Sequence, residues 1–255
     1  MLPDTLVFGR IKIKLDAIGS TNDYIHDLLT KGEDLTEGTV VFAENQSAGR
    51  GQRGNKWDSE PGQNLTFSVV LFPKFLSPSD QFSLSKAISL GIVSYLSGVL
   101  SVNMSAIRVK WPNDIYVRDK KIGGILIENA VSGTKLIHSI IGIGINVNQE
   151  EFNPGLPNPS SMKLVAGCGF ELNEVLSELC THLDRRYFEL RNCSHQNMHT
   201  EYLDKLYEYH VWRDFKVKGV AIRGRILDVL QSGKLVIEVK DGEDIQCDYK
   251  EVVFC

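Results

Sequence analysis

Apolar residues recur along the N-terminal part of the chain with two different spacings, which predict strands and helices in alternation. Residues 11–18 (IKIKLDAI) alternate apolar and polar positions, as a half-buried strand does. The polar run Ser20-Thr21-Asn22-Asp23 then predicts the capped start of a helix that ends near Gly32. The stretches 39–45 (TVVFAEN) and 64–72 (NLTFSVVLF) predict two more strands.

The longest apolar stretch, residues 82–102, carries leucines and isoleucines at helical spacing, and it predicts a long helix. Three strands are then expected in quick succession, at 107–111, 121–131 and 135–148, and their short links favour antiparallel pairing. A connector rich in proline, 153–161, must be a loop. Helical spacing returns twice, in 171–191 and in a shorter segment marked by Tyr202, Leu206 and Tyr209.

The pattern changes near Val211. From there short strands alternate with Ser-Gly and Asp-Gly turns, and no helical period is present. We therefore expect an α+β chain with two domains. Residues 1–209 would form the larger domain, and residues 210–255 a small all-β domain of the size of an SH3-like barrel.

Composition adds that this is an ordinary soluble globular chain, with 42% hydrophobic and 24% charged residues. The net charge of −4 gives no indication of nucleic-acid binding. The segment 82–102 contains Lys86 and six serines, which favours a buried helix over a membrane span. The first residues lack the pattern of a signal peptide, so a cytoplasmic location is expected.

Cysteine and histidine positions indicate neither disulfides nor a metal site. The five cysteines are widely spaced and form no C-x-x-C pair, so buried free thiols are expected. His195 and His199 have the i, i+4 spacing of a metal pair, but a third ligand is missing. We interpret them as surface or structural residues.

Residues 49–54 (GRGQRG) match the dinucleotide-binding pattern G-x-G-x-x-G, yet their context argues against that function. A true fingerprint opens a helix and has an acidic partner about 20 residues on. Here a Pro-Gly pair and another strand follow, and no carboxylate lies between Glu60 and Asp80. What remains is a glycine loop bearing Arg50 and Arg53. It is either an anion-binding loop or a solvated hairpin.

Two further stretches favour the anion-binding interpretation. In 108–117 (RVKWPNDIYV), Lys110 ends a strand before a Pro-Asn-Asp turn, where it can offer a point charge to a phosphate or carboxylate. In 142–148 (GIGINVN), Gly142 and Gly144 remove side chains from one strand, as happens where a ligand approaches the backbone closely. A solvated lysine and a sheet bulge are the corresponding structural alternatives.

Taken together, these stretches resemble a known family. STN, AENQSAGRGQRGNKW, PGQNL, KWPNDIY with KIGGILIE, and GIGINVN occur in the order and approximate spacing of the biotin protein ligases, which biotinylate carrier proteins such as that of acetyl-CoA carboxylase. The matching segments lie between residues 16 and 148, and the β-rich tail resembles the small C-terminal domain of that family. The chain looks like the monofunctional type, because the pattern starts within the first 20 residues and leaves no room for an N-terminal DNA-binding domain.

The resemblance implies a catalytic domain with a central mixed sheet backed by helices, similar to class II aminoacyl-tRNA synthetases. It implies a ligase reaction in two steps: biotin and ATP give biotinyl-5′-AMP, and a carrier-protein lysine then attacks this adenylate. Substrates and partners would be biotin, ATP with Mg²⁺, and a biotin carboxyl carrier protein or domain. No tightly bound cofactor, nucleic acid or membrane is expected, and both a monomer and a homodimer stay open.

The resemblance also implies roles for individual residues. Catalysis is expected from Lys110, Arg50 and Arg53, and no protein ligand to a metal is predicted. Biotin contacts are expected from Ser20, Thr21, Asn22, Gln46, Gly49, Arg50, Gly51, Gln52, Lys110 and Gly124. Nucleotide contacts are expected from Arg50, Trp57, Lys110, Asn113, Gly142, Gly144 and Asn146. Asp114 is either a site residue or a turn residue.

One residue departs from the family pattern. The loop usually reads G-R-G-R-x-G, and Gln52 stands where the second arginine is expected. We hypothesise that Arg53 takes over part of its charge, or that Arg50 and Lys110 suffice. Two rival functions are weighed: a lipoate or octanoate ligase, whose Arg-Arg and Gly-Gly-Gly signature is absent, and a non-catalytic ligand-binding module, which Gln52 alone favours.

Overall fold

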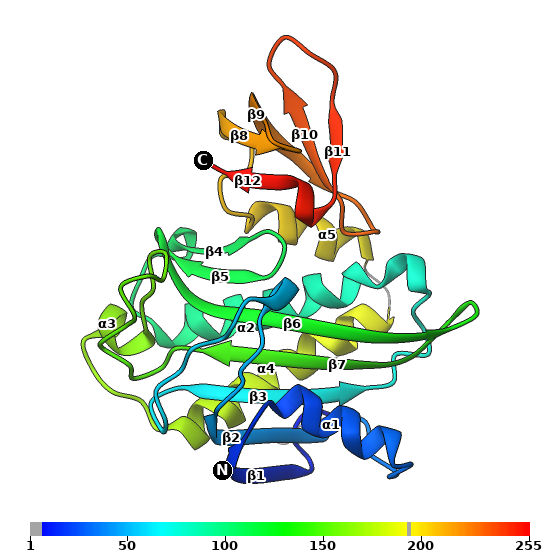
Figure 1. The fold of residues 1–255 in the computed structure, drawn as a ribbon, viewed down its shortest axis with the longest axis vertical. Helices are drawn as coiled ribbons and strands as arrows, with labels where there is room; N and C mark the ends of the chain where they lie inside the picture. Colours follow the sequence, from blue (N-terminus) through cyan, green and yellow to red (C-terminus); the bar gives the residue numbers. More distant parts are fainter. Residues whose placement is uncertain (1–6, 193–194) are drawn as a thin grey trace.

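The computed structural model describes residues 7–192 and 195–255, which form a large mixed sheet with helices and a second, smaller sheet (Figure 1). The large sheet has the strand order β1-β2-β3-β7-β6-β5-β4. β1 and β2 run parallel and the other neighbours pair antiparallel. Its strands are β1 (Lys12–Ile18), β2 (Val40–Gln46), β3 (Leu65–Leu71), β4 (Ile107–Lys110), β5 (Asp114–Val117), β6 (Lys120–Ser132) and β7 (Lys135–Ile145).

The two faces of the large sheet are covered differently. Helices α2 (Phe82–Val99) and α4 (Leu172–Asn192) lie behind the sheet in Figure 1, whereas α1 (Thr21–Thr30) crosses in front of β2 and β3. Strand alternation separates the two cores: Val40, Val69 and Ile141 belong to the main core with α2 and α4, whereas their neighbours Val41, Val70 and Ile140 pack with Ile25 of α1. The front face beyond α1 is therefore free to hold a site.

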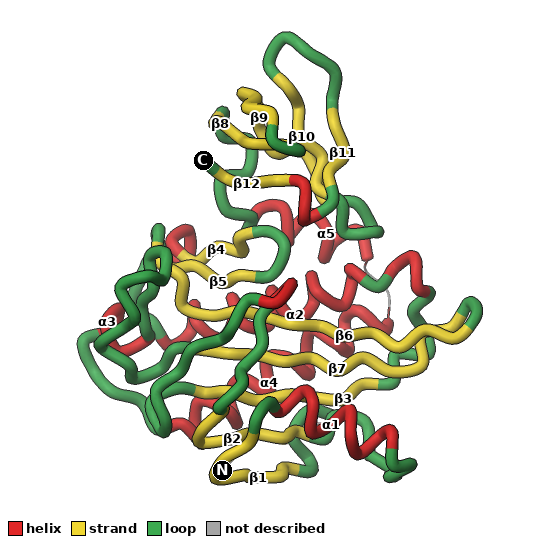
Figure 2. The backbone as a smooth tube through the Cα atoms, viewed as in Figure 1, coloured by secondary structure: helices red, strands yellow, loops and turns green. Residues whose placement is uncertain are grey.

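The smaller sheet is antiparallel, with the strand order β11-β10-β9-β8-β12. Figure 2 shows it above the large sheet, next to α5 (His195–Asp204) and the β4–β5 hairpin. Its strands are β8 (Arg213–Val217), β9 (Val220–Val229), β10 (Leu235–Val239), β11 (Ile245–Cys247) and β12 (Val252–Phe254). The short strands expected after Val211 are confirmed.

Most elements agree with the sequence pattern, and three do not. A turn was expected at residues 112–114 with no strand directly after it, but β5 begins at Asp114, and a short helix, α3 (Met162–Ala166), follows the proline-rich connector. The helix expected from Tyr202, Leu206 and Tyr209 ends at Asp204, because the next residues pair with the edge of β4: Val109 N donates to Lys205 O at 2.8 Å, and Tyr207 N donates to Val109 O at 2.8 Å. Tertiary pairing overrides the helical spacing there.

Helix α2 behaves as a core helix. In the part of the chain that the structure describes, the segment Pro78–Val99 is long and apolar enough to span a membrane, but 72% of its apolar 18-residue window is buried inside the protein. The cysteines differ in their burial. Cys180 and Cys247 are buried as expected, Cys168 and Cys255 are exposed against expectation, and Cys193 lies outside the described residues.

Candidate functional site

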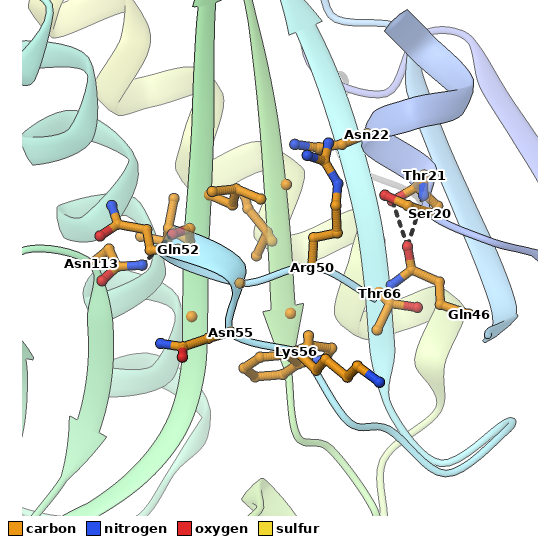
Figure 3. A pocket seen from close by; sticks show the side chains of 18 of the residues that line it. Ser20, Thr21, Asn22, Gln46, Arg50, Gln52, Asn55, Lys56, Thr66 and Asn113 are labelled. Atoms are coloured by element: carbon orange, nitrogen blue, oxygen red, sulfur yellow. Dashed lines mark hydrogen bonds between the residues drawn. The ribbon is translucent and has the colours of Figure 1, made fainter. Parts of the chain in front are cut away.

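A cavity of about 100 Å³ lies on the front face of the large sheet, beyond the N-terminus of α1. Its floor consists of β7 and β6 where Gly144 pairs with Gly124 and Gly142 pairs with Leu126. The β2–β3 connection, residues 47–64, crosses this face and forms the outer wall (Figures 2 and 3). Glycines in two adjacent strands thus leave room for a ligand between sheet and loop.

One end of the cavity is polar and tightly hydrogen-bonded. Gln46 Oε1 accepts from Thr21 N at 2.8 Å and from Thr21 Oγ1 at 3.1 Å (Figure 3). Ser68 Oγ lies 2.6 Å from Thr21 Oγ1 and donates to Asn22 Oδ1 at 2.6 Å. Ser20 caps α1, since its Oγ accepts from Asp23 N. The helix start thereby holds hydroxyl and amide groups in fixed positions around a small polar pocket.

Arg50 anchors the loop over the cavity. Its guanidinium donates two hydrogen bonds to Glu128, at 2.9 Å to Oε1 and 2.7 Å to Oε2, and it lies 2.7 Å from Asp23 Oδ1. Glu128 Oε2 also accepts from Asn22 Nδ2 at 2.7 Å. This bidentate pair joins the loop to β6 and to α1 at once. We call these contacts of Arg50 with Glu128 and Asp23 the clasp of the loop.

Trp57 lies across the glycine floor. A Cβ added to Gly124 would come 3.1 Å from Trp57 Cζ3, and one added to Gly144 would overlap the indole. The indole Nε1 is buried without a hydrogen-bond partner. The loop reaches this position as a small hairpin, in which Trp57 N donates to Gly49 O at 2.9 Å. The glycines thus make room for an aromatic wall.

The opposite end of the cavity carries charge. Lys121 Nζ lies 2.7 Å from Asp114 Oδ1 and 5.8 Å from the centroid of the Trp57 ring. Asn113 lies beside them and donates from Nδ2 to Ile125 O at 2.6 Å. Asp114 is the first residue of β5 and lines the cavity, so it is not a turn residue only.

Lys121, and not the expected Lys110, lines this end of the cavity. Lys110 does not line the cavity: its Nζ lies among aromatic rings, 5.2 Å from the centroid of Tyr116, 5.8 Å from that of Tyr207 and 5.1 Å from that of Phe254. Burial lowers the pKa of Lys110. Its strand, β4, is the edge of the sheet, so its side chain lies at the smaller sheet instead of at the glycine floor. Lys121 has the position that was assigned to Lys110.

Two other predicted residues lie beside the cavity, and a third is not described. Asn146 is buried and donates from Nδ2 to Ser160 O at 2.9 Å, so it holds the next loop and does not line the cavity. Gly49 belongs to the hairpin itself, opposite Trp57, where a Cβ would overlap Trp57 O. The side chain of Arg53 lies outside the described part of the structure. The cavity does bring together a majority of the predicted residues: Ser20, Thr21, Asn22, Gln46, Arg50, Gly51, Gln52, Trp57, Asn113, Gly124, Gly142 and Gly144.

Metal-binding capacity is limited. Within residues 7–192 and 195–255, no group of three or more His, Cys, Asp or Glu side chains could hold a metal ion. Asp114 contributes one carboxylate to the cavity lining, with its side chain 26% exposed. A single carboxylate suits Mg²⁺ when phosphate oxygens and waters complete the shell.

Comparison with known proteins agrees with this geometry. Residues 15–146 match the model of the biotin/lipoate A/B protein ligase family. The chain is 29% identical over 244 residues to the bifunctional ligase/repressor BirA of Bacillus spizizenii, covering 93% of this chain and 72% of that protein. It is 26% identical over 238 residues to the biotin–[acetyl-CoA-carboxylase] ligase of Mycobacterium tuberculosis, covering 91% and 81%. Among solved structures, the biotin protein ligase of Aquifex aeolicus in complex with biotin and ATP superposes with a TM-score of 0.77 at 26% identity, covering 96% and 98%.

Proposed function

The chain belongs to the biotin/lipoate A/B protein ligase family, and from this premise we propose that it is a biotin–[biotin carboxyl-carrier protein] ligase. It activates biotin with ATP as biotinyl-5′-AMP and transfers the biotinyl group to a lysine of a carrier protein. Relatives along nearly the whole chain carry this activity in their names, and a similar structure holds biotin and ATP together.

The observation that carries the proposal is the polarity of the cavity. Neutral hydrogen-bonding groups of Thr21, Gln46 and Asn22 occupy one end, and Lys121 occupies the other. Biotin has the same polarity: a neutral ureido head, an apolar chain and a carboxylate. Between the two ends lies the bare backbone of Gly142 and Gly144, which suits the apolar chain.

In the first step the biotin carboxylate attacks the α-phosphorus of ATP, and pyrophosphate leaves. The protein has to bring two anions together, so its contribution is positioning and positive charge. Lys121 supplies that charge at the cavity end. Ser20, Thr21, Asn22 and Gln46 fix the ureido head, while the Arg50 clasp keeps the loop closed. Trp57 and Asn113 lie beside the nucleotide.

In the second step the neutral ε-amine of the acceptor lysine attacks the acyl carbon. A C–N bond forms, the bond between the acyl carbon and the phosphate oxygen breaks, and AMP leaves with the electron pair. The reaction requires no nucleophile from the enzyme, which agrees with a cavity whose lining, among the described residues, contains no Cys or His and whose single carboxylate, Asp114, is paired with Lys121.

We also infer that Mg²⁺ enters with ATP and that Asp114 is the carboxylate available to it. The ion supplies charge neutralisation at the phosphates when bound. Asp114 would hold the ion from the cavity wall, and Lys121, 2.7 Å from Asp114 Oδ1, would supply its ammonium beside the same oxygens. Magnesium dependence of adenylate formation in an Asp114→Asn variant tests this assignment.

The finer architecture is likewise proposed. We infer a catalytic domain of residues 1–209 and a C-terminal domain of residues 210–255, whose five antiparallel strands form an SH3-like barrel; the register shift between Val236 and Ile237, opposite β9, supplies curvature for closure. A reaction that uses ATP and carrier proteins points to the cytoplasm. Carrier proteins of biotin-dependent carboxylases are the expected macromolecular partners.

ATP/pyrophosphate exchange tests the function directly. Exchange that depends on biotin, followed by transfer to an apo carrier domain, is expected. Exchange with lipoate and none with biotin would select the lipoate ligases, which share the family. Absence of exchange with both acids, together with calorimetric biotin binding, would select a non-catalytic binding module.

A further inference from the structure

A second cavity, of about 200 Å³, opens from the candidate active site. It shares Gln52, Asn113 and Ile125 with the first cavity and continues between β6 and the first half of α2. Figure 3 shows Gln52 and Asn113 together on the side of the pocket opposite Thr21 and Gln46. The two cavities therefore meet at the end where the acyl adenylate would form.

The second cavity leads from the surface to a buried interior. Ser232, in the connection between β9 and β10, is exposed and lies at its outer end, and Ser85 is half-buried. Ser89 of α2 is fully buried, with 0% of its surface exposed. The apolar walls of the second cavity include Phe82 and Ile127. This is a passage between the smaller sheet and α2.

The chemistry of the passage is unusual in two respects. The side chains that line it are all uncharged. Two of its buried oxygens, Gln52 Oε1 and Ser89 Oγ, have no hydrogen-bond partner in the structure. Leaving a buried acceptor without a partner costs stability, so such atoms mark a place where a ligand brings donors.

We propose that this passage admits the side chain of the acceptor lysine, with Gln52 and Ser89 receiving its amine; this inference rests on the proposed function. The apolar walls contact the methylene chain, and the two oxygens accept from the terminal nitrogen. Gln52 presents an acceptor oxygen where an arginine would present only donors, and it therefore does not repel the incoming amine.

The absence of charge from the lining serves the transfer step. A lysine ammonium has no lone pair, so the acceptor must lose a proton before it attacks. Burial without a carboxylate partner disfavours the charged form and lowers the pKa of the amine. The first proton passes to water at the mouth, and the neutral nitrogen then forms the C–N bond. The nitrogen loses its second proton to water, the bond between the acyl carbon and the phosphate oxygen breaks, and AMP leaves with the electron pair.

The experiment separates the two half-reactions. Ser89→Met and Ser85→Met narrow the passage at two depths, and Ser83→Met is the matched control, because Ser83 lies on the same helix but does not line this passage. Biotin-dependent ATP/pyrophosphate exchange reports adenylation. Single-turnover transfer from preformed biotinyl-AMP to an apo carrier domain reports the lysine step, and release by hydroxylamine reports a nucleophile too small to need the passage.

We expect the two narrowing variants to slow transfer to the carrier by about tenfold or more, with exchange and hydroxylamine release within about twofold of wild type. Ser83→Met should leave all three rates unchanged. If either narrowing variant folds, exchanges normally and transfers to the carrier as fast as wild type, the passage is not the route of the lysine. Loss of exchange in the wild-type protein itself would instead refute the proposed function.

A charge placed in the passage gives a second measurement. Ser85→Asp should stabilise the ammonium form of the acceptor, and it should move the pH profile of single-turnover transfer upward by about one unit. The pH profile of exchange should not move. An unmoved transfer profile in a folded, exchanging Ser85→Asp protein contradicts the proposed role of the uncharged lining.

Discussion

Lys121 and Asp114 form an ion pair of 2.7 Å across the β5–β6 ladder, and both side chains line the cavity. Regular alternation would not place Lys121 there. Asp114 pairs with Gly124, but the register shifts after Ile115, so that Tyr116 pairs with Lys121. The bulge moves Lys121 onto the face that Asp114 and Gly124 share, and Ile122 is turned into the core.

The first prediction concerns which lysine serves adenylation. Lys121→Met should lower biotin-dependent exchange by about 10²–10³-fold, because it removes the positive charge at the reacting end. Lys110→Met should keep exchange within about threefold, because the Lys110 ammonium lies among aromatic rings and does not line the cavity. Pyrophosphate-exchange rates at saturating ATP decide between them. The opposite ranking would return Lys110 to the site.

This pair also marks the limit of what the sequence could predict. The strands of the large sheet follow from alternation, and the polar and glycine residues around the cavity follow from the family motifs. A bulge inside KIGGILIE leaves no signature in the pattern, so the sequence could not show that Lys121, and not Lys110, lines the cavity. The end of α5 was missed for a similar reason: the pairing of Tyr207 with Val109 is a tertiary contact.

The second prediction tests the glycine floor of the cavity, where Gly144 lies against the Trp57 indole. Gly144→Ala should displace the Trp57 indole, since the added Cβ would overlap it, and should weaken ATP binding by about tenfold or more. Gly98→Ala is the control, because Gly98 in α2 has no atom within 4 Å of the added Cβ. Calorimetric titration with a non-hydrolysable ATP analogue and biotin measures both. Equal affinities of the two variants for the ATP analogue would show that Trp57 does not contact the nucleotide.

The third prediction concerns the clasp of the loop. Glu128→Gln should weaken biotin binding by about tenfold, because Arg50 and Asn22 both lose a charged acceptor that holds the loop against β6 and α1. Glu44→Gln removes a comparable surface pair, with Lys14, and should leave affinity unchanged. Isothermal titration with biotin alone gives both constants. Unchanged binding in Glu128→Gln would mean that the loop closes without the clasp.

The fourth prediction is a pH dependence of stability outside the site. Lys86 of α2 is 4% exposed, and its ammonium lies 2.8 Å from His199 Nδ1 and donates to Val229 O at 3.1 Å. His199 Nε2 in turn lies 3.0 Å from Asp228 Oδ1. Burial lowers the pKa of Lys86 from 10.5 to about 8, and the Asp228 carboxylate opposes that shift. The chain of contacts joins α2, α5 and β9.

The sign follows from proton binding. Between pH 8 and 10.5 the unfolded chain holds a proton on Lys86 that the folded chain has lost, so the free energy of unfolding should rise with pH in that window. From pH 8 to 9.5 the rise should be about 1–2 kcal/mol.

Cys180 has the opposite effect on the free energy of unfolding above pH 9, because burial raises the pKa of its thiol to about 12. The contribution of Lys86 is therefore the slope of the wild-type protein minus the slope of Lys86→Met. Lys216→Met, an exposed lysine, should keep the wild-type slope. Urea unfolding across this range measures all three slopes, and identical slopes for wild type and Lys86→Met would show that Lys86 keeps its ordinary pKa despite its burial.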